Sequence, residues 1–517
     1  MAAPRLSRST IWIFFLTLLS RVSGFFRTTI LAAAFGTTLN TDAYVMASAI
    51  PNLLFGSVFQ GVSVATVPSM TDARAHEEAQ DFQRFINQMW TVLVGAAIAM
   101  SILGEIFAPQ LVDFLALGFH GQERYKTILM SRIMIPSIIF WISSGYLTGI
   151  LQAGENFFGL TLSPLVVNLV QIFGILVLGH FFSIYGVAWG FTLAIAAQLA
   201  LLLPLLRRRG VKLSLSWPLD HPRVKAMLRL MGPYLLISST ASIELITDRM
   251  LASSMATGSI SAMNFAFTVS QVPLGVIIAP VITPIYTRLA VLHAGVARER
   301  FSALAMRGLR WVLVLTVPVS LVLFILNFPI LRVIYERGHF NAYSLTLTSH
   351  LFLFAILALP ANALSSYLQQ MSFATKNTRR PAQFNLAAVI VNIAGNLILT
   401  RFMGVYGLVL ATTVANWTNT VLLAWSFHAR RHIARQAAFV VALAVAGAAM
   451  AAAIAALAWQ LHLNHVTGLV RLVLEIGFSA LVGGTVYGVL LLLFRVPEAQ
   501  QMRQYAIRMM RRVAAVG

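Results

Sequence analysis

Long apolar segments, each able to cross a bilayer as a helix, recur along the whole chain. A helix needs roughly 20 apolar residues to span about 30 Å of hydrocarbon, and windows of that length are separated here by charged residues, Pro or Gly. Helices are expected because lipid offers no hydrogen-bond partner to an open strand, and the sequence lacks the ten-residue alternation of an outer-membrane barrel. We therefore predict an all-α polytopic membrane protein. The predicted spans, about fourteen in number, are 10–33, 42–69, 88–112, 128–153, 157–180, 184–206, 230–254, 259–287, 308–330, 346–373, 382–400, 404–427, 437–460 and 468–494.

The composition agrees with this class and excludes others. Hydrophobic residues make up 58% of the 517 residues and charged residues only 10%, against roughly 25% charged in soluble proteins. The net charge of +21 does not indicate a nucleic-acid partner, because such proteins place their basic residues beside a polar domain. The chain has no cysteine, which excludes disulfides, thiolate nucleophiles and Cys-ligated metals. It also has no Walker loop, HExxH or nucleophile-elbow motif. We therefore expect no enzyme activity, no catalytic residue, no bound metal and no cofactor.

The basic residues fall mainly on one side of the predicted helices. If the N-terminus is cytoplasmic, that side collects 27 of the 37 Lys and Arg residues, and the other side collects six. The positive-inside rule then predicts that both termini are cytoplasmic. Most of the positive charge is therefore explained by the orientation of the helices in the membrane. The basic segment 503–512 is expected to lie as an interfacial helix on anionic lipid.

The two halves of the chain resemble each other. Matching residues recur in the same order at an offset close to 222, which predicts two copies of a six-helix unit that enter the membrane in the same sense. The matching pairs are Arg27/Arg249, Gly36/Gly258, Asp42/Asn264, Pro51/Pro273, Pro136/Pro360 and Asn168/Asn392. We predict an N-terminal lobe over 1–206, a cytoplasmic basic linker over 207–229 and a C-terminal lobe over 230–436. Two additional helices follow over 437–494, and a basic cytoplasmic tail covers 495–517.

Four basic residues remain inside the predicted spans: Arg21, Arg27, Arg132 and Arg249. A charge at mid-bilayer costs at least about 2.5–3.5 kcal/mol, so such residues usually face a bundle interior or a wet cavity. Arg21 and Arg27 lie about 120° apart around a helix, and both can line one cavity, where guanidinium groups suit phosphate or carboxylate ligands. The alternatives are that Arg27 snorkels to the surface and that Arg21 pairs with a carboxylate. Arg132 is expected to be an interfacial anchor.

Acidic residues in the spans are candidates for gating or ion pairing. Asp42 opens the second span, where it either caps the helix or takes part in gating. Glu244 and Asp248 share one helix face at a spacing of four residues. They form either a cation or proton site, or the partners of Arg21 and Arg27.

Several motifs resemble those of a known family. They include Ser20 to Arg27 (SRVSGFFR), Thr41 to Tyr44 (TDAY) and Ile50 to Leu54 (IPNLL), followed in the second half by Thr247-Asp248-Arg249, Glu336-Arg337-Gly338 and Gly404 to Gly407 (GVYG). On these motifs the chain is similar to the MurJ/MviN family of lipid II flippases, within the multidrug/oligosaccharidyl-lipid/polysaccharide (MOP) exporter superfamily. The resemblance covers nearly the whole chain and weakens over the last two spans.

The resemblance implies a flippase of the bacterial cytoplasmic membrane. Two six-helix lobes would enclose a cationic cavity, the two added helices would form a groove for a polyprenyl tail, and alternating access would carry lipid II outward for peptidoglycan synthesis. The resemblance places Arg21, Arg27 and Asp42 at positions that the family needs for transport. We predict that the substrate-binding residues are Arg21, Arg27, Asn52 and Thr268, and that the gating or ion-pairing residues are Asp42, Glu244, Asp248 and Arg249. The implied partners are lipid II or a related polyprenyl-pyrophosphate saccharide, membrane lipids and cell-wall synthesis enzymes.

The sequence also departs from the family pattern. Phe55 and Gly56 stand where the family usually has arginines, Gln60 where it has Glu, Thr268 where it has Arg and Ser366 where it has Lys, while Glu244 replaces a common Asn. A less cationic cavity is therefore expected. Two alternatives stay open: a cation-coupled exporter of the MATE type that uses Glu244 and Asp248, and an inactive scaffold for cell-wall enzymes. Transport could be coupled to the membrane potential or to a monovalent cation.

Overall fold

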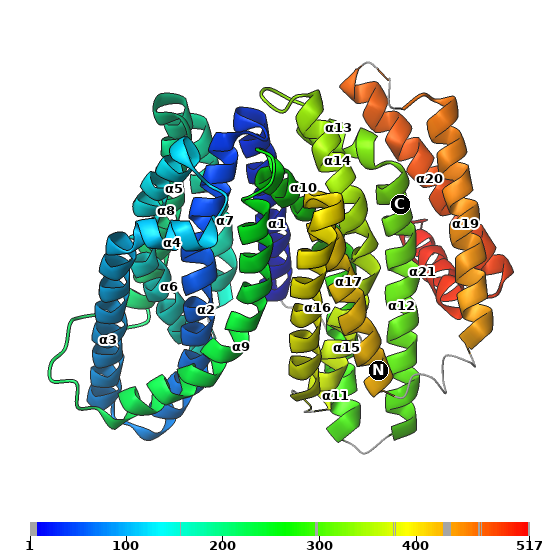
Figure 1. Cartoon of the computed structure of the whole chain (residues 1–517). Coiled ribbons are helices and arrows are strands. Elements are labelled where there is room, and N and C mark those ends of the chain that lie inside the picture. The colour runs from blue at the N-terminus through cyan, green and yellow to red at the C-terminus, as the bar shows by residue number, and fades with distance from the viewer. Residues whose placement is uncertain are drawn as a thin grey trace. The chain divides into compact units, whose positions relative to one another are not determined.

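The computed structural model describes residues 8–155, 157–294, 298–375, 377, 379–427, 436–463, 466 and 468–514. Residues 428–435, near the end of the predicted C-terminal lobe, lie outside these residues. By internal packing the chain divides into two compact units, Met1–Phe265 with Arg337–Ser344, and Ala266–Glu336 with Leu345–Gly517. The helices of both units are labelled in Figure 1.

The first unit contains α1 to α9 and the start of α10. Their bounds are α1 Arg8–Phe35, α2 Leu39–His76, α3 Ala79–Ile106, α4 Ala108–Leu115, α5 Gly121–Met134, α6 Ser137–Ala153, α7 Phe157–Phe173, the π-helical turn η1 Gly174–Leu178, α8 Gly179–Arg207, α9 Pro222–Ala252 and α10 Ser259–Pro273. Helix α2 begins at an N-cap formed by Thr38, whose side chain accepts a hydrogen bond from the Thr41 amide. Asp42 is therefore not the N-cap of this helix, because it lies inside the first turn.

The second unit contains the remaining helices. They are η2 Leu274–Ile278, α11 Ala279–Ala294, α12 Arg298–Ile325, α13 Asn327–Tyr335, α14 Ala342–Leu357, α15 Leu359–Ala374, α16 Arg379–Met403, α17 Val405–Ser426, α19 Ala437–Gln460, α20 Leu469–Leu493 and α21 Pro497–Ala514. Helices α19 and α20 pack with α12 around a buried apolar cluster that includes Leu443, Met450 and Leu491. The basic segment 503–512 lies within α21, as the sequence predicts.

All fourteen predicted spans fall on helices, which confirms an all-α polytopic membrane protein. Among the described residues, nine helical stretches are long and apolar enough to cross a membrane, or ten if the bent pair α5 and α6 counts as one span. One stretch, Phe157–Arg207, covers two predicted spans, and Ser183 inside it has the non-helical angles φ 53° and ψ −143° that mark the break between them.

The internal repeat is visible in equivalent buried hydrogen bonds. In the first unit the Tyr146 hydroxyl donates to the Ile86 carbonyl at 3.0 Å, and in the second unit the Tyr367 hydroxyl donates to the Ala305 carbonyl at 2.8 Å. A second pair of bonds has the same sequence separation: Thr192 donates to the Ile133 carbonyl, and Thr413 to the Phe354 carbonyl. Since Tyr146 and Tyr367 are 221 residues apart, as are Thr192 and Thr413, the two halves share helix-to-helix packing as well as sequence pattern.

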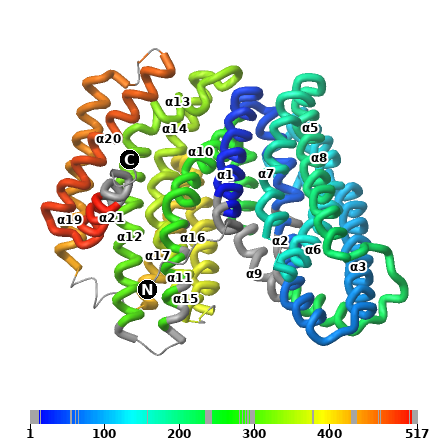
Figure 2. The backbone as a smooth tube through the Cα atoms, turned by 180° about the vertical axis from the view of Figure 1, so that it is seen from behind, coloured from blue at the N-terminus to red at the C-terminus, as the bar shows by residue number. Residues whose placement is uncertain are grey.

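The linker between α8 and α9 runs beside α3 (Figure 2). Side chains at a spacing of four residues on α3, those of Gln83, Asn87 and Thr91, bond alternate linker residues Lys212, Ser214 and Ser216. Four helical residues rise about 6.0 Å and two extended residues about 6.6 Å, so the two patterns stay in register. Residues 212–216 of the linker are thus held by α3, whereas residues 222–229, which the sequence assigned to the linker, form the start of α9.

Candidate binding site

Helix α1 carries Arg27 into the interior of the first unit. Asn168 on α7 donates to the Ser20 carbonyl at 2.9 Å, and a Cβ atom added at Gly24 would lie 3.2 Å from the Asn168 amide nitrogen. The two helices therefore approach closely at Gly24. One turn further along both helices, the Arg27 guanidinium donates to the Gln171 side-chain oxygen at 2.9 Å. Because the Gln171 amide is neutral, it positions Arg27 without neutralising the positive charge of the guanidinium, which can therefore bind an anionic ligand.

Helix α9 brings a second guanidinium to the same cavity. Arg249 donates from Nη1 to the Val45 carbonyl of α2 at 3.2 Å. The charge of Asp248, its neighbour in sequence, acts on Arg249, and Asp248 itself is buried with only 3% of its surface exposed. Arg249 is the repeat counterpart of Arg27, so the cavity receives one arginine from equivalent positions in each half of the sequence.

The two arginines line a cavity of about 340 Å³ within the first unit. Its described lining contains no Asp or Glu, which makes it a cationic site. The lining residues come from six helices, α1, α2 and α6 to α9, together with η1 and α10: Arg27, Thr28, Leu31, Tyr44, Val45, Ser48, Asn52, Trp141, Val167, Gln171, Ile175, Phe191, Ile195, Arg249 and Asn264. Polar groups set in an apolar wall are typical of a ligand site, and this volume is near the lower end of the usual 300–1,000 Å³.

One end of the first unit is closed by a set of hydrogen bonds, here called the gate cluster. Its centre is Asp42, whose carboxylate is 3% exposed and accepts the backbone amides of Gly258 at 2.5 Å and Ser261 at 2.7 Å. These amides are at the N-terminus of α10, where unsatisfied N–H groups and the helix dipole favour a negative charge. The remaining members are the Thr37–Ser344 hydroxyl pair at 2.6 Å, the His339 amide on the Ala33 carbonyl at 2.8 Å and the Gly118 amide on the Ser253 hydroxyl at 3.0 Å.

Glycine is required at this closed end. Gly258 has φ +92°, a left-handed conformation that side chains rarely adopt, and an added Cβ would lie 2.8 Å from the Thr37 carbonyl oxygen. Gly338 has φ +58°, and its Cβ would lie 2.3 Å from the Ala33 carbonyl oxygen. Backbones that pack this closely leave no room for water or ligand between them.

The structure distributes the sequence-predicted residues unevenly. Arg27 and Asn52 line the cavity, and so does Arg249, which the sequence suggested for gating. Arg21 lies exposed on α1 and is not part of the described lining. Thr268 is half-buried in the second unit and is not among the described lining residues. Of the acids, Asp42 centres the gate cluster, whereas Glu244 is half-buried on α9 near the charge of Asp248.

Sequence reasoning missed Tyr44, Trp141 and Gln171, which also line the cavity. A glutamine inside the apolar window 157–180 was the available signal for Gln171, since an amide in lipid needs a partner. The two aromatic residues are indistinguishable from core residues by pattern alone.

Comparison with known proteins identifies the class and then the family. The fold is similar to that of a lipid II flippase MurJ in an inward closed conformation, with a TM-score of 0.79, 22% identity, and coverage of 92% of this chain and 98% of the other. It also matches an inward-facing multidrug resistance MATE family transporter of the MOP superfamily, with a TM-score of 0.68, 11% identity, and coverage of 82% and 96%. The fold is therefore that of a multi-pass MOP-type transporter.

Sequence comparison supplies the family. The family model "Lipid II flippase MurJ" matches residues 31–479. A probable lipid II flippase MurJ of Rhizobium tropici is 30% identical over 432 residues, which are 81% of this chain and 80% of the relative. A lipid II flippase MurJ of Burkholderia cenocepacia is 29% identical over 419 residues, 79% of this chain and 81% of the relative. The chain belongs to the MurJ family of lipid II flippases, which confirms the predicted resemblance and a multi-pass transporter of the bacterial inner membrane rather than an enzyme.

Proposed function

We propose that the chain moves lipid II from the inner to the outer leaflet by alternating access, and that Arg27 and Arg249 bind its pyrophosphate. The proposal rests on one observation: Arg27 and Arg249, which occupy equivalent positions in the two repeats, line the same cavity, and the described lining of that cavity has no carboxylate. Guanidinium forks match phosphate oxygens bidentately. A cavity of about 340 Å³ suits a pyrophosphate and the start of its substituents, not a whole saccharide-peptide headgroup.

The remaining predicted residues have supporting roles in this proposal. Asn52 contributes an amide to the cavity wall, and Arg21, six residues before Arg27 on α1, adds a contact to the headgroup from the exposed side. Thr268, where the family usually has an arginine, is proposed as a neutral contact that would weaken the grip on the substrate. Glu244 and Asp248 are proposed to moderate the positive charge of Arg249, because both carboxylates lie on the same helix.

Asp42 is proposed as the gate on the outer side. Its hydrogen bonds to the α10 amides would form when this end is closed and break when it opens. This orientation rests on the distribution of Lys and Arg, which predicts that both termini are cytoplasmic. An inside-negative potential would favour outward movement of the anionic headgroup by about 2.3 kcal/mol per charge for each 100 mV crossed.

Complementation of a cell that lacks its own lipid II flippase tests the proposal, with outer-leaflet lipid II as the measured quantity. Arg27→Ala and Arg249→Ala should each lower transport about tenfold or more, because each removes a charged hydrogen-bond donor. Arg132→Ala is the matched control, since Arg132 is an arginine that lies exposed at the end of α5 and outside the cavity. Wild-type transport by both cavity variants, at normal membrane levels, would refute the pyrophosphate assignment.

The cation-coupled alternative has a separate outcome. Transport that depends on Glu244 and Asp248, but not on Arg27 or Arg249, would favour an exporter of another molecule. The buried position of Asp248 on α9 is the observation that keeps this alternative in view.

A further inference from the structure

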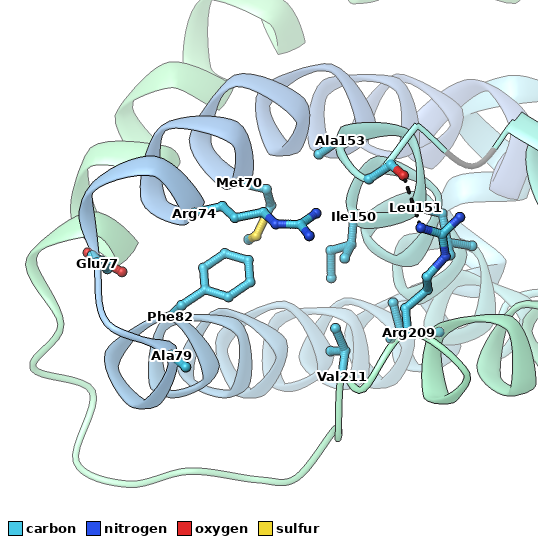
Figure 3. A pocket seen from close by; sticks show the side chains of 12 residues that line it. Met70, Arg74, Glu77, Ala79, Phe82, Ile150, Leu151, Ala153, Arg209 and Val211 are labelled. Atoms are coloured by element: carbon cyan, nitrogen blue, oxygen red, sulfur yellow. Dashed lines mark hydrogen bonds between the residues drawn. The ribbon is translucent and has the colours of Figure 1, made fainter.

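A second cavity, of about 360 Å³, lies at the end of the first unit that carries the linker. It is separate from the site with Arg27, and the two share no lining residue. Its walls come from the end of α2, the start of α3, the ends of α6 and α8, and the linker (Figure 3). By the positive-inside prediction this end is cytoplasmic. We here call it the linker pocket.

Two arginines converge in the linker pocket on the end of α6. Arg209 donates from Nη1 to the Gly154 carbonyl at 3.5 Å, drawn as a dashed line in Figure 3. Arg74 extends from α2 into the pocket in the same view, and its Nη1 lies 4.0 Å from the position that a Cβ atom would take on Gly154. In the described part of the chain, Arg74 has no hydrogen bond or ion pair with any side chain.

Protein groups do not balance this positive charge. The C-terminus of α6 supplies about −0.5 of a charge through the helix dipole. Glu77 also lines the pocket; its Oε1 accepts from Arg223, which donates to Asp72 as well, while its buried Oε2 has no hydrogen-bond partner among the described residues. Because the single charge of Arg223 is shared between Glu77 and Asp72, about +0.5 of a charge is left in the pocket, and the two lining guanidinium groups match the oxygens of a phosphate group.

Apolar residues occupy the membrane side of the same pocket. Met70, Ile150, Leu151 and Leu206 line it, and each lies at or within three residues of the end of a predicted span. Arg74 and Arg209 lie three to five residues beyond those span ends. From the membrane interior outward, the predicted spans therefore place the apolar wall before the guanidinium groups. The acyl chains and the phosphate of a phospholipid follow the same order.

The linker holds this arrangement in place. Arg209 and Val211 line the pocket, and the hydrogen bonds of Gln83 and Asn87 on α3 fix the residues that follow immediately. The pocket is thus built partly from a segment outside the predicted helices, whose position depends on α3.

We propose that the linker pocket binds a phospholipid of the inner leaflet, with its phosphate between Arg74 and Arg209 and the start of its acyl region against Met70 and Leu206. The site goes beyond the transport function and does not depend on it. A phospholipid bound here would link the end of α6 to the linker, which leads into the start of α9.

Native mass spectrometry of the full-length protein tests this, with phosphatidylglycerol as the added lipid. The wild-type protein should retain one lipid more tightly than the rest. Arg74→Gln and Arg209→Gln should each weaken that binding about tenfold, because each removes charged donors to the phosphate. Arg208→Gln is the matched control, since it removes the same charge from the neighbouring residue, which does not line the pocket. Ala153→Phe should also reduce binding by filling the pocket without changing the charge.

The outcomes are distinct from those of the transport assay. Equal loss of lipid in Arg208→Gln and Arg74→Gln would overturn the proposal, because the binding would then reflect overall charge. Displacement of the lipid by an equal concentration of glycerol 3-phosphate would also overturn it, in favour of a soluble phosphate ester. Undiminished tight binding in both Arg74→Gln and Ala153→Phe would place the lipid elsewhere. Loss of transport in Arg27→Ala with intact lipid retention would support the transport proposal and leave this one unaffected.

Discussion

The gate cluster makes a quantitative prediction for Asp42→Asn. The carboxylate accepts two backbone amides at the positive end of α10, Gly258 at 2.5 Å and Ser261 at 2.7 Å. Asparagine keeps one acceptor oxygen but turns an NH₂ group toward the other amide, so at least one charged hydrogen bond is lost. Such a bond contributes about 1.5–3 kcal/mol. If it exists only when this end is closed, the closed-to-open ratio should fall about 10- to 150-fold.

Labelling of an introduced cysteine can measure how often the gate opens, because the chain has no native cysteine that would react as well. Ser48→Cys places a single thiol in the Arg27 cavity, and a membrane-impermeant maleimide added from outside reports how often the gate opens. In the Ser48→Cys background, Asp42→Asn should raise the labelling rate by the factor above. Asp113→Asn is the matched control, because it removes a carboxylate from an exposed ion pair with Arg124 instead of from the gate. Unchanged labelling in a folded Asp42→Asn variant would refute the reasoning.

Three further predictions concern stability. Tyr146→Phe and Tyr367→Phe each remove one of two donors from a carbonyl that lies inside a helix, so each should lower the free energy of unfolding by about 0.5–1.5 kcal/mol. A loss in only one of them, measured by thermal unfolding in detergent, would contradict equivalent roles. Arg223 holds the pKa of the Asp72 carboxyl below its usual 3.8, chiefly by donating a hydrogen bond to it. Because the pKa of Asp72 is lower in the folded protein than in the unfolded chain, the contact with Arg223 is fully stabilising above about pH 3.8, and its stabilisation is lost as pH falls through the folded pKa. Proteolysis of the linker should therefore increase below pH 3.8. A cleavage rate that does not depend on pH would contradict this role of the contact. In the second unit, Arg310→Met leaves the Glu498 carboxylate, which is 2% exposed, without its cation, and should cost about 3–5 kcal/mol. Adding Glu498→Gln should recover most of that loss, and no recovery would show that the pair is not coupled.

The helical architecture could be predicted from the sequence because it is a local property. Lipid forces each apolar window to satisfy its backbone within one helix, so spans such as 437–460 and 468–494 are visible without knowledge of their neighbours. The repeat was also visible, since Arg27 and Arg249 occupy matching places in two ordered patterns. Which residues carry charge inside the membrane follows from composition, because so few charged residues remain once loops are assigned.

The site required the tertiary structure. From sequence alone Arg21 and Arg27 were equal candidates, and only the close approach of α1 to α7 at Gly24 shows that Arg27 faces Gln171 and the cavity while Arg21 is exposed. Likewise the sequence left Asp42 open between capping its own helix and gating. The structure shows its carboxylate on the amides of another helix, 216 residues further along.

The sequence by itself thus determined the class of protein, the helices and the small set of charges from which a site could be built. Only the tertiary structure decided which of those charges meet, as Arg27 and Arg249 do in one cavity and Arg74 and Arg209 do in another. The physical reason is that lipid acts on each helix separately and leaves a pattern in the local sequence. The direction in which a side chain points depends instead on how helices pack against each other, and that packing is set by small residues at their contacts, such as Gly24.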